Sequence, residues 1–127
     1  MSLSVLVVDD EKSLTDLITE SLKSFNVFKT VIPAYDGIDA MRKLTNQSFD
    51  IVILDLAMPK KDGMEVLSYI SDEDLCHSKV IIISGSLTAD VIGEARNHTN
   101  HFLAKPFKIE DLKMKIGQVI KEIKAAA

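Results

Sequence analysis

The sequence lacks the features that mark membrane and secreted proteins. Only one of its 127 residues is a cysteine, Cys76, which we interpret as an ordinary thiol, so no internal disulfide or structural zinc cluster is expected. The apolar runs are too short to cross a bilayer, and no basic segment precedes the first one, so neither a membrane span nor a signal peptide is expected. These absences predict a cytoplasmic location.

Clusters of basic residues are also missing. Fifteen Lys and Arg stand against nineteen Asp and Glu, a formal net charge of −4, and no dense basic run could neutralise several phosphates. Direct nucleic acid binding by this chain is therefore not expected. The histidines His77, His98 and His101 show no ligand spacing that involves the acidic residues, and we interpret them as surface side chains.

The sequence instead has a regular alternation of strand and helix patterns. Short runs of branched apolar residues predict strands buried on both faces, at residues 3–8, 27–32, 51–54, 80–83 and 102–104. Apolar residues spaced three and four apart predict a helix after each strand. The second strand should stop near Pro33, and the fourth helix, within 88–97, should be short because Gly93 lies inside it. The pattern predicts one α/β domain over residues 1–127, a doubly wound five-stranded parallel sheet.

Charged residues follow three of the predicted strands. Asp9 and Asp10 follow the first, Asp55 the third and Lys105 the fifth. In an open parallel sheet the ligand crevice lies beyond the carboxyl ends of the strands, so these groups are expected to converge. Convergent acids repel one another unless a cation joins them, and Mg²⁺ suits them because it binds carboxylate and phosphate oxygens. The pattern predicts a phosphoryl-transfer site.

With this order of elements, the whole chain resembles the receiver domain of two-component response regulators. The resemblance rests on four motifs, Val7-Val8-Asp9-Asp10-Glu11, Asp55-Leu56-Ala57-Met58-Pro59 with Asp62-Gly63, Ser84-Gly85, and Phe102-Leu103-Ala104-Lys105-Pro106-Phe107. Each motif is weak alone, but their joint occurrence in order, each at the end of a predicted strand, is strong. The resemblance implies a flavodoxin-like (βα)5 three-layer sandwich and a phosphorylation-activated signalling switch, not a conventional enzyme.

The resemblance also implies roles for the acidic residues. Asp55 matches the phosphoacceptor, which takes a phosphoryl group from the phosphohistidine of a histidine kinase to give an aspartyl phosphate. Asp10, Asp55 and the backbone carbonyl of Ala57 would be direct Mg²⁺ ligands, with Asp9 a partner mostly through water. A cation is required because the carboxylate and the phosphoryl group are both anionic.

Three further residues match groups that respond to the phosphoryl group in this family. Ser84 would hydrogen-bond a phosphoryl oxygen, and Lys105 would pair first with Asp55 and then with the phosphoryl group. The bond between Lys105 and Pro106 matches a cis peptide that aims the lysine inward. Phe102 matches the switch aromatic that turns inward when Ser84 moves, although a Phe beside a short strand is also typical of a core.

The implied partners are proteins. A histidine kinase or phosphotransfer protein would supply the phosphoryl group. An output domain or partner protein would bind the surface formed by the fourth helix, fifth strand and fifth helix. Self-association as a homodimer is also expected there, because the last helix has a mixed charged face suited to reversible contacts.

Some residues depart from the family pattern. His98-Thr99 stands where a Gly-Ala pair is usual, so the loop before the fifth strand should be built differently. Ala57 and Ser86 flank the path of an attacking water in the family, so they should tune the lifetime of the phosphoryl group.

Three other functions fit the sequence less well than a signalling switch. A phosphohydrolase of the haloacid dehalogenase type needs a second acid two residues after its nucleophile, where this chain has Ala57. An FMN-binding module needs a Gly/Ser/Thr-rich loop after the first strand, where this chain has acids. A pseudo-receiver that makes only protein contacts would not need the full set of matching residues, which are Asp9, Asp10, Asp55, Ser84 and Lys105.

Overall fold

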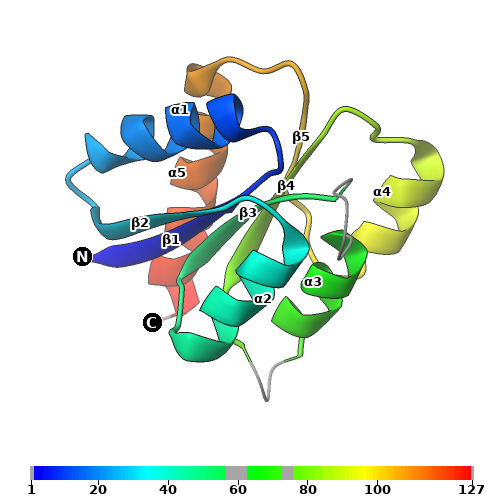
Figure 1. The fold of residues 1–127 in the computed structure, drawn as a ribbon, viewed down its shortest axis with the longest axis horizontal. Helices are drawn as coiled ribbons and strands as arrows, with labels where there is room; N and C mark the ends of the chain where they lie inside the picture. Colours follow the sequence, from blue (N-terminus) through cyan, green and yellow to red (C-terminus); the bar gives the residue numbers. More distant parts are fainter. Residues whose placement is uncertain (1, 57–62, 73–75, 127) are drawn as a thin grey trace.

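The described residues form one parallel sheet with helices on both faces (Figure 1). The computed structural model describes residues 2–56, 63–72 and 76–126. Its strands, in chain order, are β1 (Leu3–Val8), β2 (Phe28–Ala34), β3 (Ile51–Asp55), β4 (Lys79–Ser84) and β5 (Phe102–Ala104). In space the order is β2-β1-β3-β4-β5, and every neighbouring pair is parallel. The predicted doubly wound five-stranded sheet is confirmed.

The order of the strands places the site. The chain moves from β1 outward to β2, then returns to add β3 on the other side of β1. Val8 at the end of β1 therefore pairs with Leu54 near the end of β3. This reversal is the point where open α/β sheets form their ligand crevice.

The helices cover the two faces of the sheet in separate layers. They are α1 (Lys12–Lys23), α2 (Gly37–Asn46), α3 (Gly63–Ile70), α4 (Ala89–Ala95) and α5 (Ile109–Ala126). In Figure 1, α1 and α5 lie on one side of the sheet, and α2, α3 and α4 lie on the other. The described part of the chain contains no helix with both the length and the apolar character of a membrane span.

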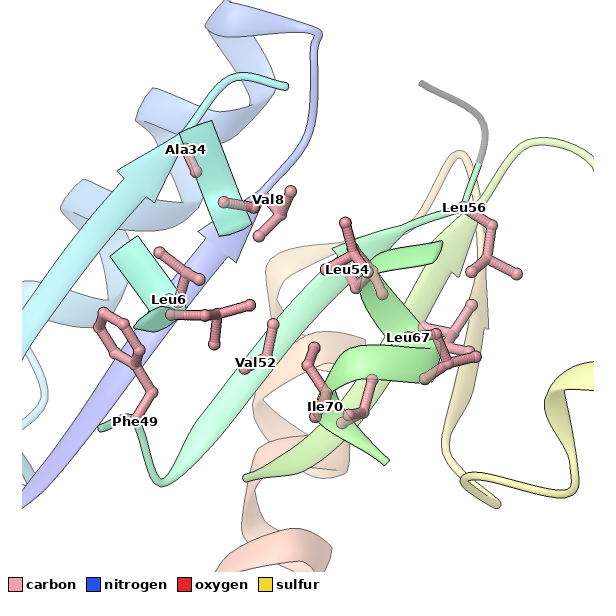
Figure 2. Packing of buried hydrophobic residues seen from close by; sticks show 14 of the residues in the cluster. Leu6, Val8, Ala34, Phe49, Val52, Leu54, Leu56, Leu67 and Ile70 are labelled. Atoms are coloured by element: carbon pink, nitrogen blue, oxygen red, sulfur yellow. The ribbon is translucent and has the colours of Figure 1, made fainter. Parts of the chain in front are cut away.

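Alternate residues of the central strands supply the two halves of the core. Figure 2 shows one half, where Leu6 of β1 and Val52 and Leu54 of β3 pack with Leu67 and Ile70 of α3. The other half combines the intervening strand residues with apolar side chains of α1 and α5. All residues of β1 and β3 are buried, which explains their unbroken apolar runs. Each fully buried aliphatic side chain contributes about 1.5–3 kcal/mol, so the core holds these two strand ends firmly.

One predicted strand boundary is wrong for a local reason, and the prediction of a short fourth helix is confirmed. Strand β2 does not stop near Pro33 but continues through it to Ala34. Because β2 is an edge strand, the missing N–H of Pro33 can face away from the ladder. Helix α4 is short and lies within the predicted segment 88–97. It begins at Ala89, after Thr88 caps it by accepting a hydrogen bond from the N–H of Val91 at 3.2 Å.

Candidate functional site at the carboxyl end of the sheet

Three carboxylates from two neighbouring strand ends meet at one point. One oxygen each from Asp9, Asp10 and Asp55 lies within 4.8 Å of the others. Asp9 and Asp55 are buried, whereas Asp10 is exposed. Such a concentration of negative charge is unfavourable without a counter-charge, and burial makes it more so. The structure thus confirms that the acids converge, and the site needs a positive charge to balance them.

Lys105 supplies the counter-charge within the chain. Its Nζ lies 2.7 Å from Oδ2 of Asp9 and donates a hydrogen bond of 3.2 Å to Oδ2 of Asp55. Burial of the ammonium group opposes its charge, but its contact with Asp9 and the negative charges of Asp55 and Asp9 outweigh that effect and raise the pKa of Lys105. The peptide bond from Lys105 to Pro106 is cis, as the family resemblance implied.

The two oxygens of Asp9 have different surroundings. Oδ1 accepts a hydrogen bond of 2.9 Å from the N–H of Glu11. Oδ2 is buried and accepts no directed hydrogen bond from the described residues, so its contact with Lys105 is an ion pair. A buried carboxylate oxygen of this kind can accept a cation or a water bound to one. Asp9, Asp10 and Asp55 each contribute one oxygen to a cluster of the hard donors that Mg²⁺ prefers.

The remaining predicted residues are distributed around this centre. Ser84 is buried at the end of β4, where its Oγ accepts a hydrogen bond of 3.1 Å from the N–H of Ser86. Its carbonyl oxygen accepts a hydrogen bond of 2.9 Å from the N–H of Lys105, which links β4 to the lysine. Phe102 is half-buried and packs against the α2, α3 and α4 side of the core. Ala57 lies outside the described residues.

Two residues that were not predicted as site residues support the site. Gly63 begins α3, and its N–H donates a hydrogen bond of 3.0 Å to the carbonyl oxygen of Leu56, directly after Asp55. Thr15 of α1 is buried beneath the acidic turn and donates a hydrogen bond of 2.8 Å to the carbonyl oxygen of Asp9. A threonine on the inner face of a helix has no distinctive sequence signal, so only its contacts reveal this role.

The histidines lie away from the acids. His77 and His98 are exposed, as predicted. The interpretation of His101 as a surface side chain is wrong, because its side chain is only 14% exposed and its Nε2 pairs with Oε2 of Glu122 on α5. Its pairing with a residue 21 positions later could not be read from local sequence.

Comparisons with known proteins place the chain among signalling proteins. The family model for the response regulator receiver domain matches residues 5–117. The chain belongs to this family. Receiver domains are phosphorylation-dependent signalling switches of two-component systems, and not conventional enzymes. The predicted family and its signalling class are thus confirmed.

The relatives match nearly all of this chain, but the match covers different fractions of their own lengths. Response regulator MprA of Mycobacterium ulcerans is 32% identical over 98% of this chain, which corresponds to 53% of MprA. Chemotaxis protein CheY-3 of Vibrio cholerae is 28% identical over 96% of this chain and 95% of its own length. The chain thus spans about half the length of MprA and of the transcriptional regulator PhoP of Bacillus subtilis.

Solved structures agree with the receiver fold. The phosphorylated cyanobacterial phytochrome response regulator RcpA superposes with a TM-score of 0.76 and 31% identity, over 92% of this chain and 91% of RcpA. The signal receiver domain of a DNA-binding response regulator from Colwellia psychrerythraea superposes with a TM-score of 0.82 and 28% identity, over 94% of this chain and 98% of that one.

Proposed function

We propose that this receiver domain accepts a phosphoryl group on Asp55 in a Mg²⁺-dependent reaction, from the phosphohistidine of a histidine kinase or phosphotransfer protein. The observation that carries the proposal is the meeting of Asp9, Asp10 and Asp55 within 4.8 Å, with Lys105 bound to two of them. Asp55 suits the nucleophile because it is buried at a strand end and held by the lysine, which limits its orientations.

The surrounding residues would supply positioning and charge. Asp10 and Asp55 would hold Mg²⁺ together with the carbonyl of Ala57, and Asp9 would contact it mostly through water. The bound ion would neutralise charge that develops on the phosphoryl oxygens during transfer. Lys105 would exchange its contact with Asp55 for one with a phosphoryl oxygen, as a flexible ammonium group can.

The hydroxyl of Ser84 would transmit the effect of phosphorylation from Asp55 to strand β5. In this structure its Oγ accepts a hydrogen bond from the amide of Ser86. A phosphoryl group on Asp55 would attract the hydroxyl as a hydrogen-bond donor, and Phe102, on the neighbouring strand β5, could then turn inward. Ser84 and Phe102 share the β4–β5 pair, in which Ser84 is opposite Ala104 and Ile82 is opposite Phe102.

The surface that would change is formed by α4, β5 and α5. Ala95 is the one buried residue of α4, so this helix has little apolar area to hold it in place. The pair of His101 and Glu122 connects the start of β5 to α5 on this surface. We infer that an output domain, a partner protein or a second copy of this domain binds there, with the choice set by phosphorylation.

Phosphoryl labelling tests the assignment directly. We expect acetyl phosphate with Mg²⁺ to add one phosphoryl group to the intact protein, as measured by mass spectrometry. EDTA should prevent the addition, and Asp10→Ala should prevent it as well, because that change removes a direct ligand. Retention of the label in Asp55→Asn, or labelling that is unchanged by EDTA, would show that the site is wrongly assigned.

The identity of the donor can be tested separately. Purified histidine kinases and phosphotransfer proteins, phosphorylated on histidine, should lose their label to the wild-type domain and retain it with Asp55→Asn. His77→Gln is a suitable control, since His77 is exposed and lies outside the acidic cluster. A transfer that this control abolished would contradict the assignment.

A further inference from the structure

We propose that Thr15 is a positioning residue for the acidic turn, and that its hydroxyl group sets the affinity of the site for Mg²⁺. The inference rests on the proposed function, because it concerns the same metal site. It adds a residue that lies one helical turn inside α1 and contributes no ligand of its own.

The contacts of Thr15 bracket Asp10. Its Oγ1 lies 2.8 Å from the carbonyl oxygen of Asp9 and 3.1 Å from that of Glu11. These carbonyl groups belong to the residues before and after Asp10. The hydroxyl proton can be shared between them or alternate. One side chain therefore restrains the peptide group that joins Asp9 to Asp10, the expected direct ligand, and the peptide group that follows Glu11.

The contact with Asp9 differs from the usual behaviour of threonine in a helix. A helical threonine ordinarily donates to the carbonyl oxygen four residues earlier, which here is that of Glu11. That oxygen already accepts the backbone N–H of Thr15 at 3.0 Å. The shorter contact of the hydroxyl goes instead to Asp9, six residues earlier and outside the helix. Thr15 is fully buried, so water does not compete readily for this bond.

Other bonds hold the rest of Asp9. Its N–H donates to the carbonyl oxygen of Ala34 at 3.1 Å, and its Oδ1 accepts from Glu11 at 2.9 Å. With Thr15 on its carbonyl oxygen, Asp9 is fixed at three atoms while Oδ2 faces Lys105. Glu11 is the N-cap of α1 but makes no side-chain capping bond. The hydroxyl of Thr15 therefore supplies a side-chain hydrogen bond that connects α1 to the acidic turn.

Rigidity of this turn matters for a small cation. Mg²⁺ demands near-ideal octahedral geometry, and groups that orient its ligands affect affinity although they do not touch the ion. Without the hydroxyl, the backbone of the acidic turn would be more mobile in the metal-free protein. Mg²⁺ would then have to order this backbone on binding, which would lower its affinity. The expected cost is that of one net hydrogen bond, a rise in the Mg²⁺ dissociation constant of about three- to tenfold.

The test compares two threonines on the same buried face of α1. Thr15→Val removes the hydroxyl with little change of shape. Thr19→Val is the matched control, because the buried hydroxyl of Thr19 donates to the carbonyl oxygen of Thr15 at 2.7 Å rather than to the acidic turn. MgCl₂ is titrated into each protein, and amide chemical shifts give the dissociation constant. We expect weaker binding in Thr15→Val, unchanged binding in Thr19→Val, and wild-type binding in Thr15→Ser.

Each outcome decides between the alternatives. A wild-type dissociation constant in Thr15→Val, or equal weakening in both valine variants, would overturn the role of Thr15. Circular dichroism in EDTA verifies folding, and Thr15→Ala replaces the valine variant and is judged by the same criteria if that variant does not fold. If the wild-type protein neither binds Mg²⁺ nor is labelled on Asp55, the proposed function fails, and this inference fails with it. Wild-type binding with an unaffected Thr15 variant overturns only the inference.

Discussion

Lys105 provides the counter-ion for a site that also suits a metal. Its ammonium group joins Asp9 of β1 to Asp55 of β3, and its side chain is 18% exposed. The ammonium group therefore offsets the negative charge of these buried acids in the absence of Mg²⁺. A bound cation and the ammonium group would compete for the same carboxylate oxygens, so the lysine should lower the affinity for metal while stabilising the metal-free protein.

We predict that Lys105→Met lowers the free energy of unfolding in EDTA by about 1.5–3 kcal/mol, the range for hydrogen bonds to charged groups. Mg²⁺ should bind this variant more tightly and restore much of the loss, since a ligand that binds only the folded state stabilises it. Urea unfolding with and without Mg²⁺ measures both effects. A variant whose stability responds to Mg²⁺ no more than that of the wild-type protein would contradict this competition.

The contribution of Lys105 to the free energy of unfolding should depend on pH. Its pKa in the folded state is raised above the ordinary value of 10.5, so its contribution to stability is complete below that value. The contribution is lost as the pH rises through the folded-state pKa. In EDTA, the difference in unfolding free energy between the wild-type protein and Lys105→Met should be constant from about pH 7 to 9 and should fall above about 10.5. A decline within the neutral range would contradict this assignment.

At the scale of elements, the start of α3 lies against the end of β3. A Cβ atom added to Gly63 would lie 2.5 Å from the carbonyl oxygen of Asp55 and closer still to the Cα of Leu56. The neighbours are backbone atoms, so a larger residue cannot be accommodated by rotating a side chain. Glycine at this position lets the helix approach the strand that carries Asp55, the proposed phosphoacceptor.

We therefore predict that Gly63→Ala destabilises the domain by about 1–3 kcal/mol, the usual cost of overpacking. It should also slow labelling of Asp55, because the displaced backbone is that of Asp55 and Leu56. Gly117→Ala in α5 is the control, since a Cβ there meets nothing within 4 Å. That change should stabilise the domain by about 0.5–1 kcal/mol through helix propensity. Thermal unfolding and timed mass spectrometry measure both quantities.

At the scale of the whole molecule, the site and the proposed output surface are joined through the two strands at one edge of the sheet. Ser84 ends β4 beside the acids, and β5 next to it carries Phe102 and leads to Lys105. Helix α4 is held by little buried area, whereas α5 packs three buried residues, Leu112, Ile116 and Val119, into the core. A change at the site should therefore move α4 and β5 more than α5.

We predict that beryllofluoride, a phosphoryl mimic, shifts amide resonances over residues 91–105 when Mg²⁺ is present, and changes self-association measured by light scattering. Ser84→Ala and Lys105→Ala should bind the mimic but show much smaller shifts, because each removes a contact that reports the phosphoryl group. Large, wild-type-like shifts in both variants would disprove the proposed roles of Ser84 and Lys105 in transmitting the change to β5. The absence of any change in association or partner binding would instead favour a domain that only makes constitutive protein contacts.

The sequence alone determined the kind and order of the elements. Apolar runs and helical spacing are local properties, and strands buried on both faces favour the nearly continuous apolar runs at residues 3–8 and 51–54. The candidate site residues could also be predicted from local sequence, because each lies at the end of a strand pattern. They are Asp9, Asp10, Asp55 and Lys105. The general rule about strand ends then predicted that they meet.

Only the tertiary structure decided which atoms touch. Pro33 continues a strand because β2 lies at the edge, and His101 is shielded because Glu122 of α5 reaches it. The roles proposed for Thr15 and Gly63 rest on close contacts with the backbone, of Asp9 for Thr15 and of Asp55 and Leu56 for Gly63. These contacts join residues that lie in different elements, so they depend on strand order, crossover and packing. No local periodicity carries that information, because it arises only when the layers are assembled.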